Sequence, residues 1–273
     1  MGPLLELAVV REALQSRLLV ELMGNAVHKV LVLKGGMAMR AVHGSVRYTK
    51  DIDLDADLKY SKERIQGIVN RSIERALSSG LIANATVSQP KQTETTLRWK
   101  IAGTQPGSSA PLNLTIEVSR RLQATPENII EVPLSAMHGG GGPGVMVQVL
   151  DSQAIAVTKI LALTDPVRMA SRDLYDLNVL IVAEVDDPAH LLALLPNAAE
   201  RLPQAMVELW PKIEAMTYEQ FRSDVIPYLP LDVANAIDEA RFEDMQLTVG
   251  ANVEKWLRAG AEALARDSAG STS

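Results

Sequence analysis

The sequence predicts an α+β fold, because strands and helices alternate up to about residue 150 and only helices follow. Up to that point, short runs of alternating apolar and polar residues recur with the period of two that is typical of half-buried strands. From Asp151 onward, apolar residues recur at helical spacing instead. We therefore expect two domains, 1–150 and 151–266, and a disordered tail over 267–273.

Each element of the first domain has its own signal. Helical spacing predicts an opening helix over 4–24. The apolar run 30–33, expected to be buried, leads into the turn Gly35–Gly36 and a short helix over 37–42. A strand is expected to begin near Asp51. Ser61 is the expected N-cap of a helix over 64–77. Alternation predicts strands at 85–88, 93–101, 112–118, 129–132 and 145–150. The glycine run 139–144 lacks the Lys-Ser/Thr ending of a P-loop, so we interpret it as a connector.

The second domain is predicted to be entirely helical. Asp151 would cap its first helix, and Pro166 would be the first residue of its second. The helices are expected at 152–163, 167–183, 188–199, 203–215, 218–226, 231–245 and 248–266.

Composition excludes several classes of protein. The chain has no cysteine, which excludes disulfides and Cys-ligated zinc or iron–sulfur centres. No apolar run approaches the ~20 residues of a membrane span, and the first residues do not resemble an export signal. We therefore expect a cytoplasmic protein that does not contact a membrane.

Charge is distributed unevenly along the chain. Residues 1–160 carry 18 Lys and Arg against 14 Asp and Glu, whereas residues 161–273 carry 9 against 19. A basic N-terminal half suits nucleotide or RNA phosphates, although the asymmetry can also be incidental. The acidic half would then face away from a nucleic acid or bind a basic partner.

Asp51 and Asp53 are the most informative residues. They occupy alternate positions of one expected strand, so their carboxylates share a face, with Cα atoms about 6.5–7 Å apart. Such a pair can hold a hard divalent cation, and the turn Gly35–Gly36 can offer backbone N–H groups to a phosphate. Two alternatives remain open: the acids at 51, 53, 55 and 57 line the exposed face of an edge strand, and the glycines only form a turn.

In order and spacing, these segments resemble the signature of the DNA-polymerase-β-like nucleotidyltransferase superfamily, and more narrowly the AbiEii/AbiGii toxins of type IV toxin–antitoxin, or abortive-infection, systems. Members read Leu-Lys-Gly-Gly-x-Ala-Leu and then Arg-x-Ser/Thr-x-Asp-x-Asp. Here the first part is Leu33 to Met39, with Met39 in place of the usual Leu, and the second is carried by Arg47, Thr49, Asp51 and Asp53. Many superfamily members have Ser where Gly36 stands, so backbone N–H groups alone would hold phosphate here.

The resemblance extends to two further segments. Glu117 lies in the alternating run 112–118, shortly before Ser119-Arg120-Arg121, and would be a third metal ligand or the general base. The run from Lys159 through Arg168 to Arg172-Asp173-Leu174-Tyr175-Asp176-Leu177 matches the family's second cluster, apart from an unusual Val157 and Thr158. By this resemblance Lys159 contacts the nucleotide phosphates and Asp173 is needed for activity.

Simpler interpretations of these segments stay open. Glu117 can be a solvent-facing residue of an amphipathic strand. Arg168, Arg172 and Asp176 are spaced four apart and can form an ion-pair ladder on a helix. Asp173 can hold Lys159 or an arginine in place without touching substrate.

The resemblance implies a polymerase-β-like domain, with a mixed twisted sheet flanked by helices, followed by a helical domain that completes the nucleotide site. It implies transfer of a nucleotide from a nucleoside triphosphate to an acceptor, with Mg²⁺ or Mn²⁺ bound. The expected acceptor is the tRNA 3′ end, which would inhibit translation, and the expected partner is a helix-turn-helix antitoxin. The implied catalytic residues are Asp51, Asp53, Glu117, Lys159 and Asp173, the implied metal ligands are Asp51, Asp53 and Glu117, and the implied nucleotide-binding residues are Lys34, Gly35, Gly36, Arg47, Thr49, Lys159, Arg168 and Arg172. Two alternatives are transfer to a small molecule or protein side chain, and a relative that binds nucleotide without catalysis.

Overall fold

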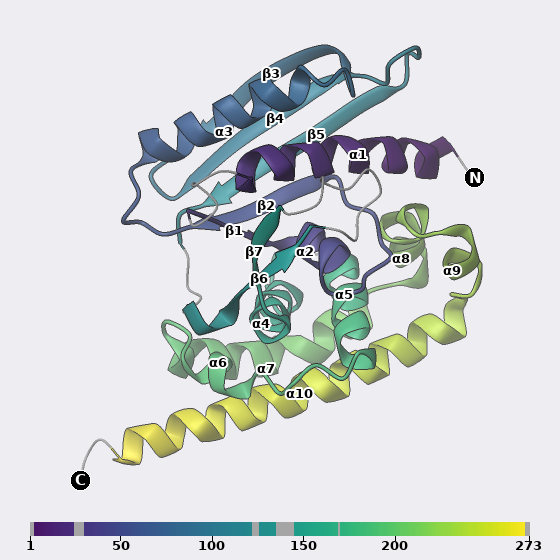
Figure 1. Ribbon diagram of the computed structural model, residues 1–273. Helices are drawn as coiled ribbons and strands as arrows, with labels where there is room; N and C mark the ends of the chain where they lie inside the picture. The colour runs from purple at the N-terminus through teal and green to yellow at the C-terminus, as the bar shows by residue number, and fades with distance from the viewer. Residues whose placement is uncertain (1–2, 25–29, 122–125, 135–144, 169, 271–273) are drawn as a thin grey trace. The chain divides into compact units, whose positions relative to one another are not determined.

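A computed structural model describes residues 3–24, 30–121, 126–134, 145–168 and 170–270 (Figure 1). The chain divides into two compact units, Met1–Leu150 and Asp151–Ser273, which we call unit 1 and unit 2. Unit 1 contains a seven-stranded mixed sheet with helices, and unit 2 is helical, so the predicted fold class is confirmed. The glycine run 139–144 lies outside the described residues.

The sheet of unit 1 has the strand order β3-β4-β5-β2-β1-β7-β6. Its strands are β1 (Leu31–Lys34), β2 (Asp51–Ala56), β3 (Ala83–Gln92), β4 (Thr96–Thr104), β5 (Pro111–Ser119), β6 (Ile129–Pro133) and β7 (Met146–Leu150). The β2/β5 and β1/β7 pairs are parallel, and the other pairs are antiparallel. Because β2 lies at the centre of the sheet, the alternative of an exposed edge strand for Asp51 and Asp53 is wrong.

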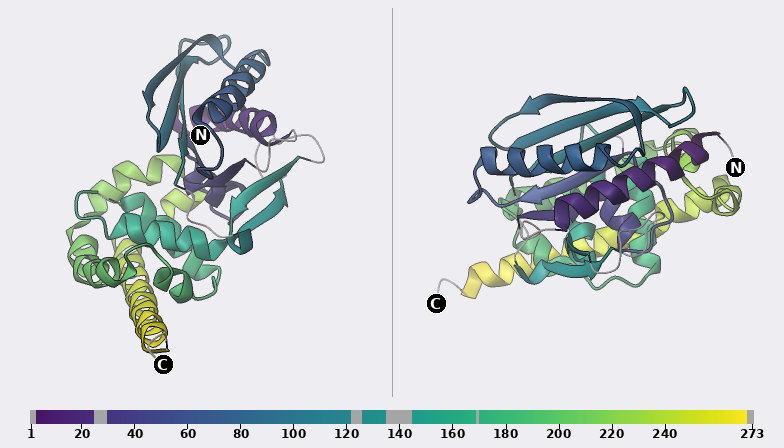
Figure 2. Two further views of the ribbon diagram at one scale, coloured as in Figure 1. Left: turned by 90° about the vertical axis from the view of Figure 1, so that its left-hand side faces the viewer. Right: turned by 45° about the horizontal axis from the view of Figure 1, so that its top comes forward.

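One face of the sheet is apolar and packs against α1 (Pro3–Met23) and α3 (Lys62–Leu77) (Figure 2). Ile52 and Ile116 are fully buried on this face, as is Trp99, whose indole nitrogen donates a hydrogen bond to Asn70 of α3 at 2.8 Å. Ser61 caps α3 as predicted, since its hydroxyl accepts from the Arg64 amide. The apolar alternation of the central strands therefore leaves their polar positions on the opposite face.

Two short elements complete unit 1. The helix α2 (Gly35–Ala41) begins directly at the end of β1, two residues earlier than predicted. A 3₁₀ turn, Pro126–Asn128, precedes β6.

The helices of unit 2 are α4 (Ser152–Leu163), α5 (Ser171–Val182), α6 (Ala189–Ala193), α7 (Ala198–Ala215), α8 (Tyr218–Asp224), α9 (Leu231–Asn235) and α10 (Glu239–Gly270), with a 3₁₀ turn at Ile226–Tyr228. Asp151 caps α4 as predicted, by accepting from the Ala154 amide at 2.7 Å. The long α10 packs along α5, α6 and α7. Gly250 permits its close approach to α7, because a Cβ there would lie 2.4 Å from the ring of Trp210. In the described part of the chain, no helix is both long and apolar enough to cross a membrane.

Several predicted helix boundaries in unit 2 are wrong. Pro166 does not begin a helix: the Asp165 carboxylate accepts from the Val167 amide at 2.9 Å, which forms a turn, and α5 starts at Ser171. The predicted helix 188–199 is two helices, separated by Asn197 in the left-handed conformation with φ 59°.

The C-terminal boundaries also differ. The predicted break after residue 245 is absent because α10 runs without interruption for 32 residues. It continues to Gly270, since no proline or glycine interrupts the run after Gly260, so residues 267–270 are helical and not the predicted disordered tail. Residues 271–273 lie outside the described residues.

Candidate active site

The three predicted acids of unit 1 lie on one face of two adjacent strands. Asp51 and Asp53 occupy alternate, half-buried positions of β2. The parallel pairing with β5 places Thr115 beside Asp51 and Glu117 beside Asp53. Because cross-strand partners point to the same side of a sheet, Glu117 shares the face of the two aspartates. These acids are therefore neighbours, although Glu117 is 64 residues further along the chain than Asp53.

Arg98 of β4 binds the Glu117 carboxylate. Its Nε lies 2.7 Å from Oε2, and its Nη2 donates to the same oxygen. Within the ranges that the structure describes, no three acidic or histidine side chains lie close enough to hold a metal ion as they stand. Glu117 would have to turn from Arg98 to join Asp51 and Asp53 around a cation.

The glycine turn packs directly against the acids and the preceding loop. Gly35 has φ +67°, and a Cβ at this position would lie 2.4 Å from the Asp53 Oδ2 atom. A Cβ at Gly36 would lie 3.1 Å from the Arg47 guanidinium and 3.2 Å from the Thr49 hydroxyl. The Lys-Gly-Gly part of the signature therefore packs against its Arg-x-Thr-x-Asp-x-Asp part at this turn. Lys34 is engaged differently, because its ammonium bonds the buried Asp55 carboxylate at 2.6 Å.

Residues of α1 and α2 support the loop that carries Arg47 and Thr49. The Gln15 side chain donates to the Thr49 carbonyl at 3.2 Å. Arg40 bonds the buried Glu12 at 2.6 Å and stacks on the Tyr48 ring at 4.4 Å. Burial raises the pKa of the Tyr48 phenol, so it stays protonated at neutral pH.

The Thr49 hydroxyl also accepts from the Asp51 amide at 3.4 Å, which connects the loop to the start of β2. Glu12 and Gln15 were not among the predicted site residues, because the sequence of the first helix signals only its apolar spacing.

The donor set of unit 1 fits a divalent cation. Asp51 and Asp53 offer carboxylate oxygens from one face of β2, and oxygen ligands suit Mg²⁺ and Mn²⁺. Because Gly35 has no side chain, its backbone can lie close against the Asp53 carboxylate. The fit to a cation therefore rests on the chemistry of the donor oxygens.

Unit 2 contains a buried cluster of charges. The Lys159 ammonium donates to Asp173 at 2.9 Å and to Asp176 at 2.6 Å, and all three side chains are at most 8% exposed. Burial by itself would lower the pKa of Lys159, but the two carboxylates outweigh it and the pKa is raised. The lysine is therefore charged at neutral pH.

Two arginines lie at the edge of this cluster. The Arg168 guanidinium lies 2.8 Å from the Asp173 Oδ2 atom, but at an angle that does not make a hydrogen bond. Arg172 donates to the Asp224 carbonyl and lies over the Tyr228 ring. These contacts differ from the ladder along one helix, and they agree with the alternative in which Asp173 holds cations in place. The importance of Asp176 was not predicted.

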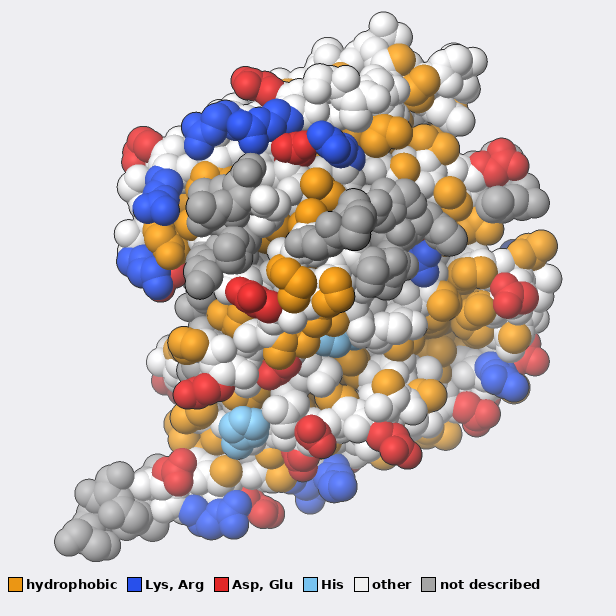
Figure 3. All heavy atoms as spheres, in the orientation of Figure 1, with side chains coloured by type: hydrophobic (Ala, Val, Ile, Leu, Met, Phe, Trp, Pro, Cys, Tyr) orange, Lys and Arg blue, Asp and Glu red, His pale blue; other side chains and the backbone are white. Residues whose placement is uncertain are grey.

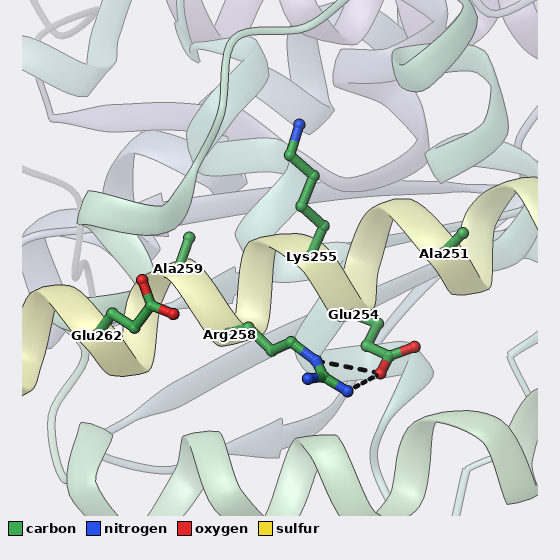
Figure 4. Close-up of a pocket in the computed structure, with 6 residues that line it drawn as sticks. All are labelled: Ala251, Glu254, Lys255, Arg258, Ala259 and Glu262. Carbon is green, nitrogen blue, oxygen red and sulfur yellow. Dashed lines mark hydrogen bonds and ion pairs between the residues drawn. The ribbon is translucent and has the colours of Figure 1, made fainter.

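A hollow of about 510 Å³ lies on α10, away from these residues in the sequence (Figure 4). It is lined by Ala251, Glu254, Lys255, Arg258, Ala259 and Glu262. All six belong to one helix, and none was predicted as a site residue. Its ion pair, Glu254 with Arg258, joins successive turns of the helix, so this hollow offers no catalytic arrangement.

Comparison with known proteins gives one family and one fold. A family model described as the nucleotidyl transferase AbiEii toxin of a type IV toxin–antitoxin system matches residues 17–264. The chain is similar to the crystal structure of a candidate nucleotidyltransferase from H. pylori, with TM-score 0.55, 17% identity, and 94% of this chain and 97% of the other covered. It is also similar to the crystal structure of JHP933 from Helicobacter pylori, with TM-score 0.54, 17% identity, and 96% and 97% covered. No curated protein sequence matches it. At this identity the two structures show the fold alone.

Proposed function

Because the chain belongs to the AbiEii family of nucleotidyltransferase toxins of type IV toxin–antitoxin systems, we propose that it transfers a nucleotide to the 3′ end of tRNA with a divalent cation at Asp51 and Asp53. Family membership makes it a nucleotidyltransferase, with a nucleoside triphosphate as substrate and an antitoxin as partner. The acceptor, the cation and the helix-turn-helix nature of the antitoxin are the proposed parts.

The proposal rests mainly on one arrangement: Gly35 packs against Asp53, and Asp53 lies beside Glu117 on the neighbouring strand. The turn places backbone beside a carboxylate that lies next to a second acid on the neighbouring strand. Asp51, Asp53 and, once released, Glu117 would hold Mg²⁺ or Mn²⁺. A bound cation would neutralise negative charge on the triphosphate as pyrophosphate leaves.

The residues around the turn have defined roles in this scheme. The backbone of Gly35 and Gly36 would approach the phosphates, with Arg47 and Thr49 beside Gly36. Lys34 would add positive charge from its position on Asp55. Glu117 would exchange its bond to Arg98 for a second cation or for the acceptor hydroxyl, from which it would take the proton.

In unit 2, the proposed nucleotide-binding residues differ in how exposed their side chains are, and this gives them different roles. Arg168 has a side chain that is 55% exposed, so its guanidinium can meet a phosphate while Asp173 orients it. Arg172, the second residue of α5, would add charge four residues further along the chain. Lys159 is buried between two carboxylates, so any contact of its own with phosphate would require it to leave one of them.

Substitution of the acids tests the proposal. Asp53→Asn and Asp51→Asn should each lower transfer of labelled nucleotide to total RNA by about 10²–10³-fold, because each removes a cation ligand. Their melting temperatures should stay near the wild-type value, since both side chains are half-buried and not part of the core. Asp57→Asn is the matched control: it belongs to the same alternating series, but its side chain is 40% exposed and pairs with Lys59.

The position of the label distinguishes the acceptors. Label on tRNA supports the proposal, whereas label on protein or on a small molecule alone would replace the acceptor that we propose. An Asp53→Asn enzyme that labels its acceptor at the wild-type rate would refute the assignment of the site.

A further inference from the structure

Charged side chains form a row across four adjacent strands of unit 1, on the face of the sheet that carries Asp51, Asp53 and Glu117. The strand register places Asp53 beside Glu117, Glu117 beside Arg98, and Arg98 beside Lys91. The row therefore changes from two acids on β2 and β5 to two bases on β4 and β3. In the neighbouring row, Asp51 lies beside Thr115 and Thr115 beside Lys100.

The basic end of these rows is open to solvent. Lys91 and Lys100 are exposed, and the Arg98 side chain is 37% exposed. The helices α1 and α3 lie against the opposite face of the sheet (Figure 2). We call Lys91, Arg98 and Lys100 the basic stripe.

Stability explains the basic stripe only in part: Arg98 neutralises the Glu117 carboxylate, but this does not account for the two lysines beside it. Lys91 and Arg98 are direct cross-strand partners, and like charges in that position are destabilising. Lysine on an edge strand can prevent unwanted strand pairing, which accounts for Lys91 on β3. That explanation does not reach Arg98 and Lys100, because β4 is paired on both sides. A cluster of cations with this cost and exposure indicates a polyanionic ligand.

We infer that the basic stripe binds the phosphate backbone of a single RNA strand whose 3′ end reacts at the acids, an inference that rests on the proposed function. With strands about 4.8 Å apart, Lys100 lies roughly 10 Å from Asp51 and Lys91 roughly 14 Å from Asp53. This is the side on which the phosphates that precede a 3′-terminal hydroxyl would lie. Arg98 is released for its phosphate when Glu117 turns to the acceptor hydroxyl or a cation.

The charge of unit 1 agrees with this ligand. Residues 1–150 carry 17 Lys and Arg against 13 Asp and Glu, although they include the proposed metal-binding acids. A small-molecule acceptor would not extend over three strands from the acids. An acidic protein is the other polyanion that could, and it is an outcome of the test below.

Binding of RNA without catalysis tests the basic stripe. Anisotropy of a labelled, short single-stranded RNA is measured in EDTA without nucleotide over a range of salt concentrations. The test variant is Lys91→Ala with Lys100→Ala. The control is Arg71→Ala with Arg75→Ala, which removes the same charge from exposed positions of α3, where basic side chains also gather (Figure 3).

Each lost phosphate contact should lower the slope of log K against log salt by ~0.7, which is about 5-fold in affinity at 0.1 M salt. The stripe variant should therefore lose about 25-fold in affinity and ~1.4 in slope, while the α3 control keeps the wild-type slope. In transfer assays, the stripe variant should raise KM for RNA and leave kcat unchanged, because it retains the acids.

Three results would overturn the inference: wild-type protein that binds RNA without salt dependence, equal binding by the stripe variant and the α3 control, and displacement of RNA more readily by polyglutamate than by unlabelled RNA. The last of these would indicate an acidic protein. Failure of the proposed function is separate, since it would appear as absence of nucleotide transfer to RNA while salt-dependent RNA binding persists.

Discussion

Lys159→Met should destabilise the protein strongly, because it would leave Asp173 and Asp176 in the interior without their shared cation. Methionine keeps the length and flexibility of the lysine side chain but removes its charge. The Lys159 ammonium bonds both carboxylates at 2.9 Å and 2.6 Å, and the two aspartate side chains are 3% and 0% exposed. Water cannot replace the lost ion pairs at that depth, so the two carboxylates lose most of the compensation for their desolvation, although Arg168 remains 2.8 Å from Asp173.

Removal of one partner from a buried ion pair typically costs about 3–5 kcal/mol of unfolding free energy. For a unit of this size, 1 kcal/mol corresponds to about 4 °C in melting temperature, so the midpoint should fall by roughly 12–20 °C. Lys255→Met is the matched control, because Lys255 is an exposed lysine of the same unit, and its substitution should stay within about 0.5 kcal/mol.

Circular dichroism during heating or urea unfolding measures the effect. Addition of Asp173→Asn and Asp176→Asn to Lys159→Met should recover much of the lost stability, because no buried charge is then left alone. Suppose that Lys159→Met had the same melting temperature as the Lys255→Met control but no longer transferred nucleotide. This result would refute a stabilising role for the buried cluster and favour direct contact of Lys159 with phosphate.

Two further perturbations have clear outcomes. Gly35→Ala and Gly44→Ala both place a side chain at positive φ, which should lower the unfolding free energy by about 1–2 kcal/mol. Only at Gly35 would the new Cβ lie 2.4 Å from the Asp53 carboxylate, so nucleotide transfer should be lost in Gly35→Ala and retained in Gly44→Ala. Equal transfer activities of the two variants would contradict this packing. The pKa of Lys159 is raised above its ordinary 10.5, so its stabilisation is complete below that pH and is lost as pH rises through the folded-state value. The unfolding free energy should decline above about pH 10.5 more steeply in the wild type than in the triple variant at Lys159, Asp173 and Asp176, and parallel pH profiles would contradict this.

The predicted strands match where one face of the strand is buried. In β4 and β5, apolar residues occupy every second position against α1 and α3, so the period of two is visible in the sequence. The edge strand β3 was predicted at 85–88 but spans Ala83–Gln92, because nearly all of its residues are exposed and no alternation is required of them. Pro90 lies within β3, and an edge strand with a register shift between Ser88 and Lys91 tolerates it.

Helix boundaries in unit 2 were harder to predict for a different reason. The turn after Asp165 and the left-handed Asn197 are made by single residues whose side chains and φ angles decide where a helix ends. An apolar stripe continues through such points in the sequence. Conversely, α10 continues past the predicted break because its apolar residues contact α5, α6 and α7 along its length.

The partners of the site residues could not be predicted at all. Alternation places Asp53 and Glu117 each on the polar face of its own strand, but only the register of β2 with β5 makes them neighbours. The same holds for Arg98, whose guanidinium binds Glu117 because β4 pairs with β5 without a shift. From the sequence, Asp176 is only a candidate member of an ion-pair ladder along one helix, whereas the packing of α4 on α5 brings it to Lys159.

The four alternating aspartates show why the register, and not the pattern, decides chemistry. In the sequence they are equivalent. In the structure, Asp55 is buried and bonded to Lys34, whereas Asp57 is part-exposed and a hydrogen bond from the Lys59 backbone amide lowers its pKa. Asp53 instead lies against a residue without a side chain, next to an acid on the parallel strand. The register with β5 places Asp53 beside a second acid, whereas Asp55 lies beside Ser119, so the ligands to test are the aspartates at the glycine turn and not those further along the strand.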